Sequence, residues 1–229
     1  MRVLVGDIGG TKTGLAVADV AGNLVTLSAS ARYPSGDYGD LADIVRRYLD
    51  ETGATVDVGS FAIAGPVVNG RSKTTNLPWT VDAGQLAQGL GFRCAYLLND
   101  LEAVAWGVAA LQPEDLAQVH AGEEGGTGNA CVVAAGTGLG EAGLYWDGSR
   151  HRAFATEGGH TDFAPADERE FALLTHLQRR IGRISWERVV SGMGIGNIYE
   201  FLASWHRASH PPAVGAALAG GGDVAAAAR

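Results

Sequence analysis

The stretch Gly6-Asp7-Ile8-Gly9-Gly10-Thr11-Lys12-Thr13 joins two apolar runs near the start of the chain. Val3 to Val5 before it is typical of a buried strand, and Gly14 to Val20 after it of a second strand. A Walker A loop would have a glycine in place of Thr11 and a helix after it. This stretch also lacks the G-x-G-x-x-G pattern of dinucleotide-binding folds. We therefore interpret the stretch as the glycine-rich turn of a strand hairpin.

A second glycine loop repeats this pattern in the other half of the chain. Gly136-Thr137-Gly138 lies between an apolar strand at 130–135 and another at 140–145. A single glycine loop is most often a tight turn, and that interpretation stays open for each loop alone. Two such loops could present backbone N–H groups and a hydroxyl to a phosphate from two sides. Asp7, at the end of the first strand, could hold a magnesium ion through water.

The pattern of apolar residues around the first loop predicts a layered α/β fold. A turn follows the second strand, and three strands in a row favour an antiparallel meander at one edge of the sheet. Helices and strands then alternate, and further helices are expected after the second glycine loop. The expected strands are 3–5, 14–20, 24–31, 58–64, 94–98, 130–135 and 140–145, and the expected helices are 41–49, 86–90, 99–111, 168–181 and 195–202.

Composition excludes several classes of partner. The chain has 229 residues, and 17 basic against 25 acidic side chains give a net charge of −8, so nucleic acid is not an expected partner. Asp7 interrupts the N-terminal apolar stretch, and no run is long enough to span a bilayer, which favours a cytoplasmic protein without a membrane partner. Cys94 and Cys131 are expected to be buried free thiols in a reducing compartment.

Six segments together resemble the bacterial glucokinase family, and they occur in the family's order from residue 1 to about 203. The resemblance implies a two-lobed ribonuclease H-like or actin-like ATPase fold that phosphorylates glucose with ATP and Mg²⁺. It also implies a homodimer and no zinc. The segments are Gly-Asp-Ile-Gly-Gly-Thr at 6–11, Asn-Leu-Pro-Trp at 76–79, Leu-Asn-Asp at 98–100, Gly-Thr-Gly-Leu-Gly at 136–140, Glu-Gly-Gly-His-Thr-Asp-Phe-Ala-Pro at 157–165 and Ser-Trp-Glu-Arg-Val-Val-Ser-Gly at 185–192.

The resemblance also implies roles for individual residues. Asp100 is the general base that takes the proton of the sugar hydroxyl, and Asn99 is a sugar-binding amide. Taken alone, Asp100 would more often be a helix N-cap, His160 a loop residue, and Glu187 a solvated charge. The substrate-binding set is Asn99, Asp100, Glu157, His160 and Glu187; the phosphate-binding set is Gly6, Asp7, Ile8, Gly9, Gly10, Thr11, Gly136, Thr137 and Gly138.

We expect a small lobe over 1–110, with the first loop and Asp100, and a large lobe over 111–229. Family members continue beyond the 185–202 segment, so the second lobe is expected to be incomplete and the fold marginally stable. The tail at 210–229 is rich in Pro, Ala and Gly, which is typical of a low-complexity segment without fixed structure.

Two other interpretations stay open. One is a non-catalytic sugar-binding or regulatory remnant, because the segment that would hold adenosine is not found. The other is a kinase of the related ROK group (repressor, open reading frame, kinase) acting on mannose or N-acetylglucosamine. Lys12-Thr13 resembles that group, but no cysteine follows Cys131, so its zinc motif is absent. Neither the choice among hexoses nor that between ATP and polyphosphate follows from the residues.

Overall fold

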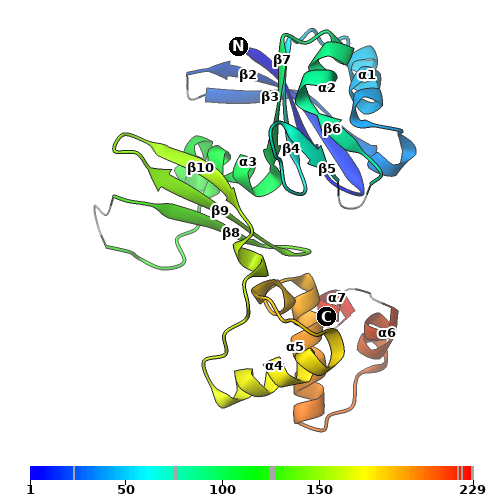
Figure 1. The fold of residues 1–229 in the computed structure, drawn as a ribbon, viewed down its shortest axis with the longest axis vertical. Helices are drawn as coiled ribbons and strands as arrows, with labels where there is room; N and C mark the ends of the chain where they lie inside the picture. The colour runs from blue at the N-terminus through cyan, green and yellow to red at the C-terminus, as the bar shows by residue number, and fades with distance from the viewer. Residues whose placement is uncertain (23, 75–76, 124–126, 221, 223, 228–229) are drawn as a thin grey trace. The chain divides into compact units, whose positions relative to one another are not determined.

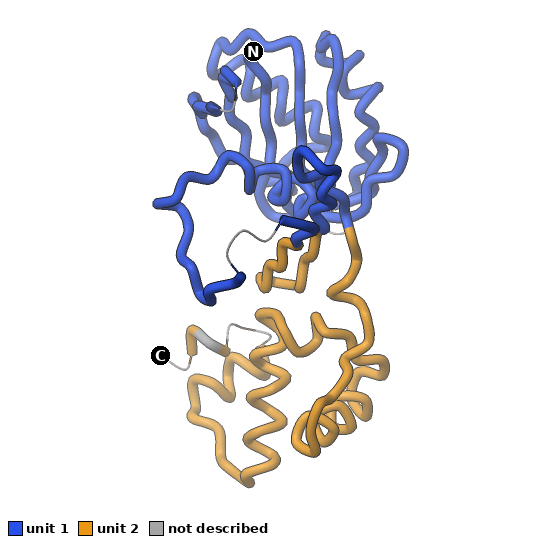
Figure 2. The backbone as a smooth tube through the Cα atoms, turned by 90° about the vertical axis from the view of Figure 1, so that its left-hand side faces the viewer, with its two compact units in different colours: residues 1–130, 143–155 blue, residues 131–142, 156–229 orange. Residues whose placement is uncertain are grey.

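The computed structural model describes residues 1–22, 24–74, 77–123, 127–220, 222 and 224–227. It contains two compact units. Unit 1 consists of Met1–Ala130 and Gly143–Ala155, and unit 2 of Cys131–Ala142 and Thr156–Arg229 (Figure 2). The units differ from the expected lobes, since residues 111–130 and 143–155 belong with the N-terminal part. The division runs through strand β9 (Leu139–Trp146), which contributes to both.

A five-stranded mixed sheet with the order β3-β2-β1-β4-β7 forms the centre of unit 1 (Figure 1). β1 pairs antiparallel with β2, and β2 with β3, which confirms the predicted meander at one edge. β4 and β7 run parallel to β1, so the sheet is of the α/β type. The strands are β1 (Arg2–Ile8), β2 (Lys12–Ala21), β3 (Leu24–Pro34), β4 (Val58–Ile63) and β7 (Cys94–Asn99).

The core of unit 1 lies between this sheet and helices α1 (Leu41–Thr52) and α2 (Ala83–Leu90). Asp40 caps the start of α1 by accepting a bond from the Asp43 N–H, and Gly53 ends the helix with a φ of 61°. The helix expected at 41–49 is confirmed and extends to Thr52. Trp79 is buried in the same cluster, as expected for a packing residue. Buried strand residues on this side of the sheet include Leu4, Ile8, Phe61 and Ile63.

Several short elements had no periodic signal in the sequence. β5 (Arg71–Lys73) and β6 (Thr80–Asp82) form a two-stranded sheet. Strands of three residues are too short for an alternation to be recognised.

Helix α3 (Asp100–Gly107) is shorter than predicted and continues as a 3-10 turn, Val108–Ala110. Asn76, the first residue of the Asn-Leu-Pro-Trp segment at 76–79, lies outside the described residues.

The second glycine loop joins two strands of a three-stranded sheet with the order β10-β9-β8. β8 (Ala130–Ala135) and β9 match the predicted strands, whereas β10 (His151–Thr156) was not predicted. Cys131 is exposed and Cys94 half-buried, so the expectation of two buried thiols was wrong. For Cys131 the reason is that β8, although apolar throughout, lies at the edge of its sheet.

Two longer helices of unit 2, α4 (Glu168–Ile181) and α5 (Gly192–Trp205), pack around a smaller core that includes Leu177 and Phe201. The tail contains helices α6 (Pro212–Gly220) and α7 (Val224–Ala227), so the expectation of no fixed structure was wrong for these residues. Alanine is the strongest helix former, which explains helices in this composition. Over the described ranges, no helix has the length and apolar character needed to cross a membrane.

Candidate functional site

Two candidate segments of unit 1 lie at the carboxyl ends of parallel strands of the same sheet. The first glycine loop, residues 9–11, follows β1, and Asn99 ends β7. In the strand register, Asp7 of β1 lies opposite Ala62 of β4, and Ile63 of β4 lies opposite Asn99 of β7. These segments therefore lie at the same edge of the sheet, the one formed by the carboxyl ends of its parallel strands. In open α/β sheets ligands bind outside this edge. We call the set Asp7, residues 9–11, Asn99 and Asp100 the unit 1 cluster.

Buried hydroxyl groups hold the first glycine loop. Ser35 Oγ donates to the Gly9 carbonyl over 2.8 Å and lies 3.0 Å from Thr13 Oγ1. The Ser35 N–H donates to the Thr11 carbonyl over 3.0 Å, and the Gly9 N–H to the Lys12 carbonyl over 3.0 Å. Sequence reasoning missed Ser35, because one serine after a strand carries no recognisable signal. The loop backbone is therefore fixed from within unit 1, while Asp7 stays exposed.

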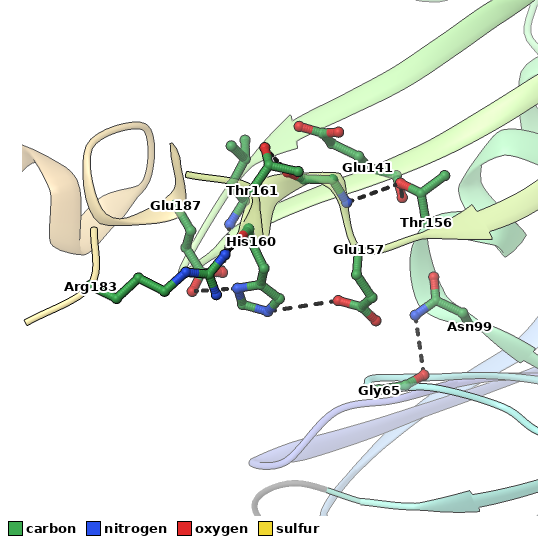
Figure 3. A network of polar contacts seen from close by, with 11 residues as sticks. Gly65, Asn99, Glu141, Thr156, Glu157, His160, Thr161, Arg183 and Glu187 are labelled. Atoms are coloured by element: carbon green, nitrogen blue, oxygen red, sulfur yellow. Dashed lines mark hydrogen bonds and ion pairs between the residues drawn. The ribbon is translucent and has the colours of Figure 1, made fainter. Parts of the chain in front are cut away.

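The N-terminus of α3 is capped by Asn99 and not by Asp100. Asn99 Oδ1 accepts from the N–H groups of Leu101 and Glu102 over 3.0 and 3.2 Å. Its Nδ2 donates to the Gly65 carbonyl over 3.1 Å, which orients the amide (Figure 3). Asp100 Oδ1 accepts from the Leu101 N–H over 2.9 Å. Within the described part of the chain, Asp100 Oδ2 has no hydrogen-bond partner, so the cap leaves this oxygen available.

In unit 2, His160 lies between two carboxylates (Figure 3). Its Nε2 is 3.7 Å from Glu157 Oε2, and its Nδ1 is 3.8 Å from Glu187 Oε1. Both separations exceed hydrogen-bond length, so these polar atoms are free to bond to a ligand. The side chains of His160 and Glu157 are 57% and 62% exposed, against 19% for Glu187. Carboxylates accept from hydroxyl groups, and an imidazole can donate or accept, which suits a polyol.

The second glycine loop contacts the same group of side chains. The Leu139 N–H donates to Glu187 Oε2 over 3.0 Å, and the Gly192 N–H donates to the Gly136 carbonyl over 2.8 Å. A Cβ on Gly138 would overlap with Glu187 Oε2, so an alanine there would displace this carboxylate. We call Glu157, His160, Glu187 and residues 136–138 the unit 2 cluster.

Arg183 is a further residue of this region that sequence reasoning missed. It donates to the His160 carbonyl over 3.0 Å and to Asp162 Oδ1 over 2.6 Å, and thereby holds the turn that carries His160 (Figure 3). A lone arginine between a helix and a turn gives no sequence signal of such a role. The turn Gly158–His160 is a short 3-10 segment, followed in the chain by a second one at Trp186–Arg188.

Comparison with known proteins identifies the family. The family model described as Glucokinase matches residues 4–228. The chain belongs to the glucokinase family. Glucokinases of Nostoc punctiforme and Synechocystis sp. are each 42% identical to it, over 92% and 88% of this chain but only 63% and 61% of their own length. The chain thus spans less than two thirds of the length of these relatives.

Solved structures of the glucokinase family agree with this assignment. A glucokinase from an Antarctic psychrotroph is 28% identical and superimposes with a TM-score of 0.80, over 96% of this chain and 71% of its own. A ROK family glucokinase from Streptomyces griseus, in complex with glucose and AMPPNP, shares the fold at 21% identity and a TM-score of 0.56, over 98% of this chain and 66% of its own. The α/β fold of sugar kinases is therefore established for this chain.

The predicted site residues of this glucokinase-family chain form two groups. Asp7, the first loop, Asn99 and Asp100 share one edge of the unit 1 sheet. The second loop, His160 and Glu187 are joined by direct contacts in unit 2, with Glu157 beside His160. Among the described residues, no three His, Cys, Asp or Glu side chains come together as a metal centre.

Proposed function

We propose that this chain binds glucose and MgATP and transfers the γ-phosphoryl group to the sugar O6. The observation that carries the proposal is the position of Asp100 in the first turn of α3, at the sheet edge that also carries the first glycine loop. Among the described residues, its Oδ2 has no hydrogen-bond partner. Membership of the family supports the reaction. Two solved relatives support both ligands: a glucokinase from Balamuthia mandrillaris is in complex with glucose, and the Streptomyces griseus glucokinase is in complex with glucose and AMPPNP.

Asp100 is the general base in this proposal. Phosphoryl transfer requires the attacking hydroxyl to lose its proton, and a positioned carboxylate can accept it. Asp100 lies in the first turn of α3, where the partial positive charge of a helix N-terminus favours an acidic side chain. Asn99 binds the sugar with its remaining amide N–H, since its oxygen already caps α3 and its other N–H bonds to Gly65.

The unit 2 cluster supplies the remaining sugar contacts. Glu157 and Glu187 accept bonds from neighbouring hydroxyl groups of the hexose, and His160 donates or accepts between them. The separations of 3.7 and 3.8 Å leave these atoms free to bond to the sugar. Exclusion of water from the bound sugar would favour transfer over hydrolysis of ATP.

The two glycine loops are proposed to contact the phosphates of ATP. Their backbone N–H groups and the hydroxyls of Thr11 and Thr137 suit phosphate oxygens. Asp7, exposed at the end of β1, suits a water-mediated contact to the Mg²⁺ of MgATP. The full phosphate set would be Gly6, Asp7, Ile8, Gly9, Gly10 and Thr11 with Gly136, Thr137 and Gly138.

The remaining features of the family are part of the same proposal. We propose two lobes, divided near residue 110, of an actin-like ATPase fold, and a cytoplasmic homodimer.

The alternative is a sugar-binding protein without phosphoryl transfer. A ROK-type preference for mannose or N-acetylglucosamine would appear as faster turnover of those sugars.

The test is glucose-dependent ADP release by the 229-residue chain and by its Asp100→Asn variant. Loss of the base should lower kcat by about 10²- to 10⁴-fold while glucose still binds. Asp50→Asn, an exposed carboxylate of α1, is the matched control and should keep the wild-type rate. Normal turnover by Asp100→Asn would exclude Asp100 as the base. Glucose binding without ADP release by the wild type would favour the sugar-binding alternative.

A further inference from the structure

Glu187 occupies an unusual position, because its two carboxylate oxygens face different parts of the unit 2 cluster. Oε2 accepts the Leu139 N–H over 3.0 Å, directly after the second glycine loop. Oε1 lies 3.8 Å from His160 Nδ1. A carboxylate is a rigid plane, so a movement of one oxygen displaces the other. One side chain therefore touches both the loop and the sugar-binding turn.

The loop, the turn and the Glu187 segment are in direct contact with one another. A Cβ on Gly159 would overlap with the Leu139 carbonyl oxygen, so the His160 turn lies directly on the end of the loop. The Trp186 N–H donates to the Thr161 carbonyl over 3.0 Å, which joins the turn to the segment that carries Glu187. The Glu187 carboxylate occupies the space that a Cβ on Gly138 would need. The loop thus contacts the turn, the turn bonds to the segment that carries Glu187, and the Glu187 carboxylate contacts the loop.

The backbone of Glu187 is itself held in place. Ser191 Oγ donates to the Glu187 carbonyl over 2.6 Å and accepts the Gly194 N–H over 3.1 Å at the start of α5. The Gly192 N–H donates to Gly136, the first residue of the loop. Because its backbone is anchored and its side chain is 19% exposed, Glu187 has little freedom other than rotation of the carboxylate.

We propose that Glu187 is a positioning residue that couples sugar binding to the geometry of the second glycine loop. The proposal rests on the proposed function, which assigns sugar to His160 and Glu187 and phosphate to the loop. A sugar hydroxyl that bonds to Oε1 reorients the carboxylate, and Oε2 transmits the change to the Leu139 N–H and to residues 136–138. Occupancy of the sugar site and loop geometry then influence one another, as linkage requires.

Amide hydrogen exchange and amide NMR shifts of the full chain test this proposal with glucose as the ligand. In Glu187→Ala we expect Leu139 exchange at least about ten-fold faster, since bonds to charged acceptors are among the stronger ones. Glu187→Gln keeps an acceptor oxygen and should lie between this variant and the wild type. Gly138→Ala keeps Glu187 but displaces its carboxylate, and should resemble Glu187→Ala at Leu139. Glu168→Gln, an exposed carboxylate of α4, is the matched control and should leave Leu139 unchanged.

The glucose response distinguishes coupling from a merely structural bond. In the wild type, glucose should shift the amides of Leu139 and residues 136–138 together with those of the His160 turn. In Gly138→Ala the turn should still respond while Leu139 does not. Unchanged protection of Ala142 and Leu144 in β9 shows that a variant is folded.

Three results would overturn the proposal. Wild-type exchange at Leu139 in Glu187→Ala excludes the bond, and glucose shifts confined to the His160 turn exclude the coupling. A wild type in which glucose shifts no amide of that turn refutes the proposed function and the coupling that rests on it. The Glu187→Ala exchange result then still decides whether Glu187 holds the loop.

Discussion

The first glycine loop, residues 9–11, and the second, residues 136–138, each join two strands and each contain threonine, but different chemistry holds them. Buried, uncharged hydroxyl groups of Thr13 and Ser35 fix the first loop. The second loop is held by the carboxylate of Glu187, which also faces His160. Similar hairpins in one chain thus have different anchors.

This difference bears on how each loop can respond to a ligand. The Ser35 and Thr13 side chains are fully buried, so no ligand can compete for the bonds of the first loop. Glu187 is partly exposed and shares its carboxylate with the sugar-binding turn, so a ligand can change the anchor of the second loop. We therefore expect a first loop that is preformed and a second loop that adjusts when sugar binds.

The largest effect on stability is expected for Gly159→Ala. The new Cβ would overlap with the Leu139 carbonyl oxygen, a backbone atom that cannot rotate away, so the turn and the second loop must separate. Overpacking of this kind destabilises proteins by about 1–3 kcal/mol, and we expect the upper end here. Urea unfolding measures the change in free energy. Gly107→Ala, with open space around its Cβ position and a helical backbone, is the control and should not destabilise the protein.

Ser35→Ala should disturb the first loop by a somewhat smaller amount. The variant removes the bond to Gly9 and leaves the Thr13 hydroxyl buried without its partner, which destabilises by about 1–3 kcal/mol. In the double variant with Thr13→Val, the unpaired hydroxyl is gone, so the combined loss should be less than the sum of the single losses. Strict additivity in urea unfolding would show that the two hydroxyls do not act as a pair.

Arg183→Met should have a smaller effect, confined to the unit 2 cluster. Its bonds to Asp162 and to the His160 carbonyl are exposed, and exposed pairs contribute about 0–1 kcal/mol. Glucose binding is the sensitive readout, because the loosened turn carries His160, and calorimetry should show a several-fold rise in Kd. High salt should reduce the difference between variant and wild type. Equal affinities at low salt would contradict a positioning role for Arg183.

The smallest effect on stability is expected at Asp82 in unit 1. Its carboxylate, unlike that of Glu187, faces no residue of the candidate site. Bonds from the Gln85 N–H and then from Arg71 lower the pKa of Asp82. Because the pKa of Asp82 is lower in the folded state, its carboxylate stabilises the fold. This stabilisation is complete above the pKa of an unfolded aspartate, near 4, and is lost as pH falls through the folded-state pKa. The Tm difference between wild type and Asp82→Asn should therefore shrink on acidification, with glucose binding unchanged at neutral pH.

Much of the fold could be predicted from local patterns. The strand hairpin around residues 6–13, the antiparallel meander, α1 and both glycine loops follow from apolar spacing and from turn or cap residues, which act over a few positions. The motifs, taken in order, indicated the family that the comparisons show. Three-residue strands, and helices in an alanine-rich tail, could not be recognised, because they have too few residues for a period or a composition dominated by small ones.

The amino-acid sequence thus determined the five strands of the unit 1 sheet, the loops and the candidate residues, since these depend on near neighbours. Which side chains hold those residues was decided by the tertiary structure. Ser35 lies 26 positions from Gly9, and Glu187 lies 48 from Leu139. The side-chain oxygen of Asn99, in contrast, accepts bonds from residues two and three positions ahead, which is why its neighbourhood could be recognised as a helix start. Hydrogen bonds over long separations depend on strand register and packing, and no local pattern of residue types reports them.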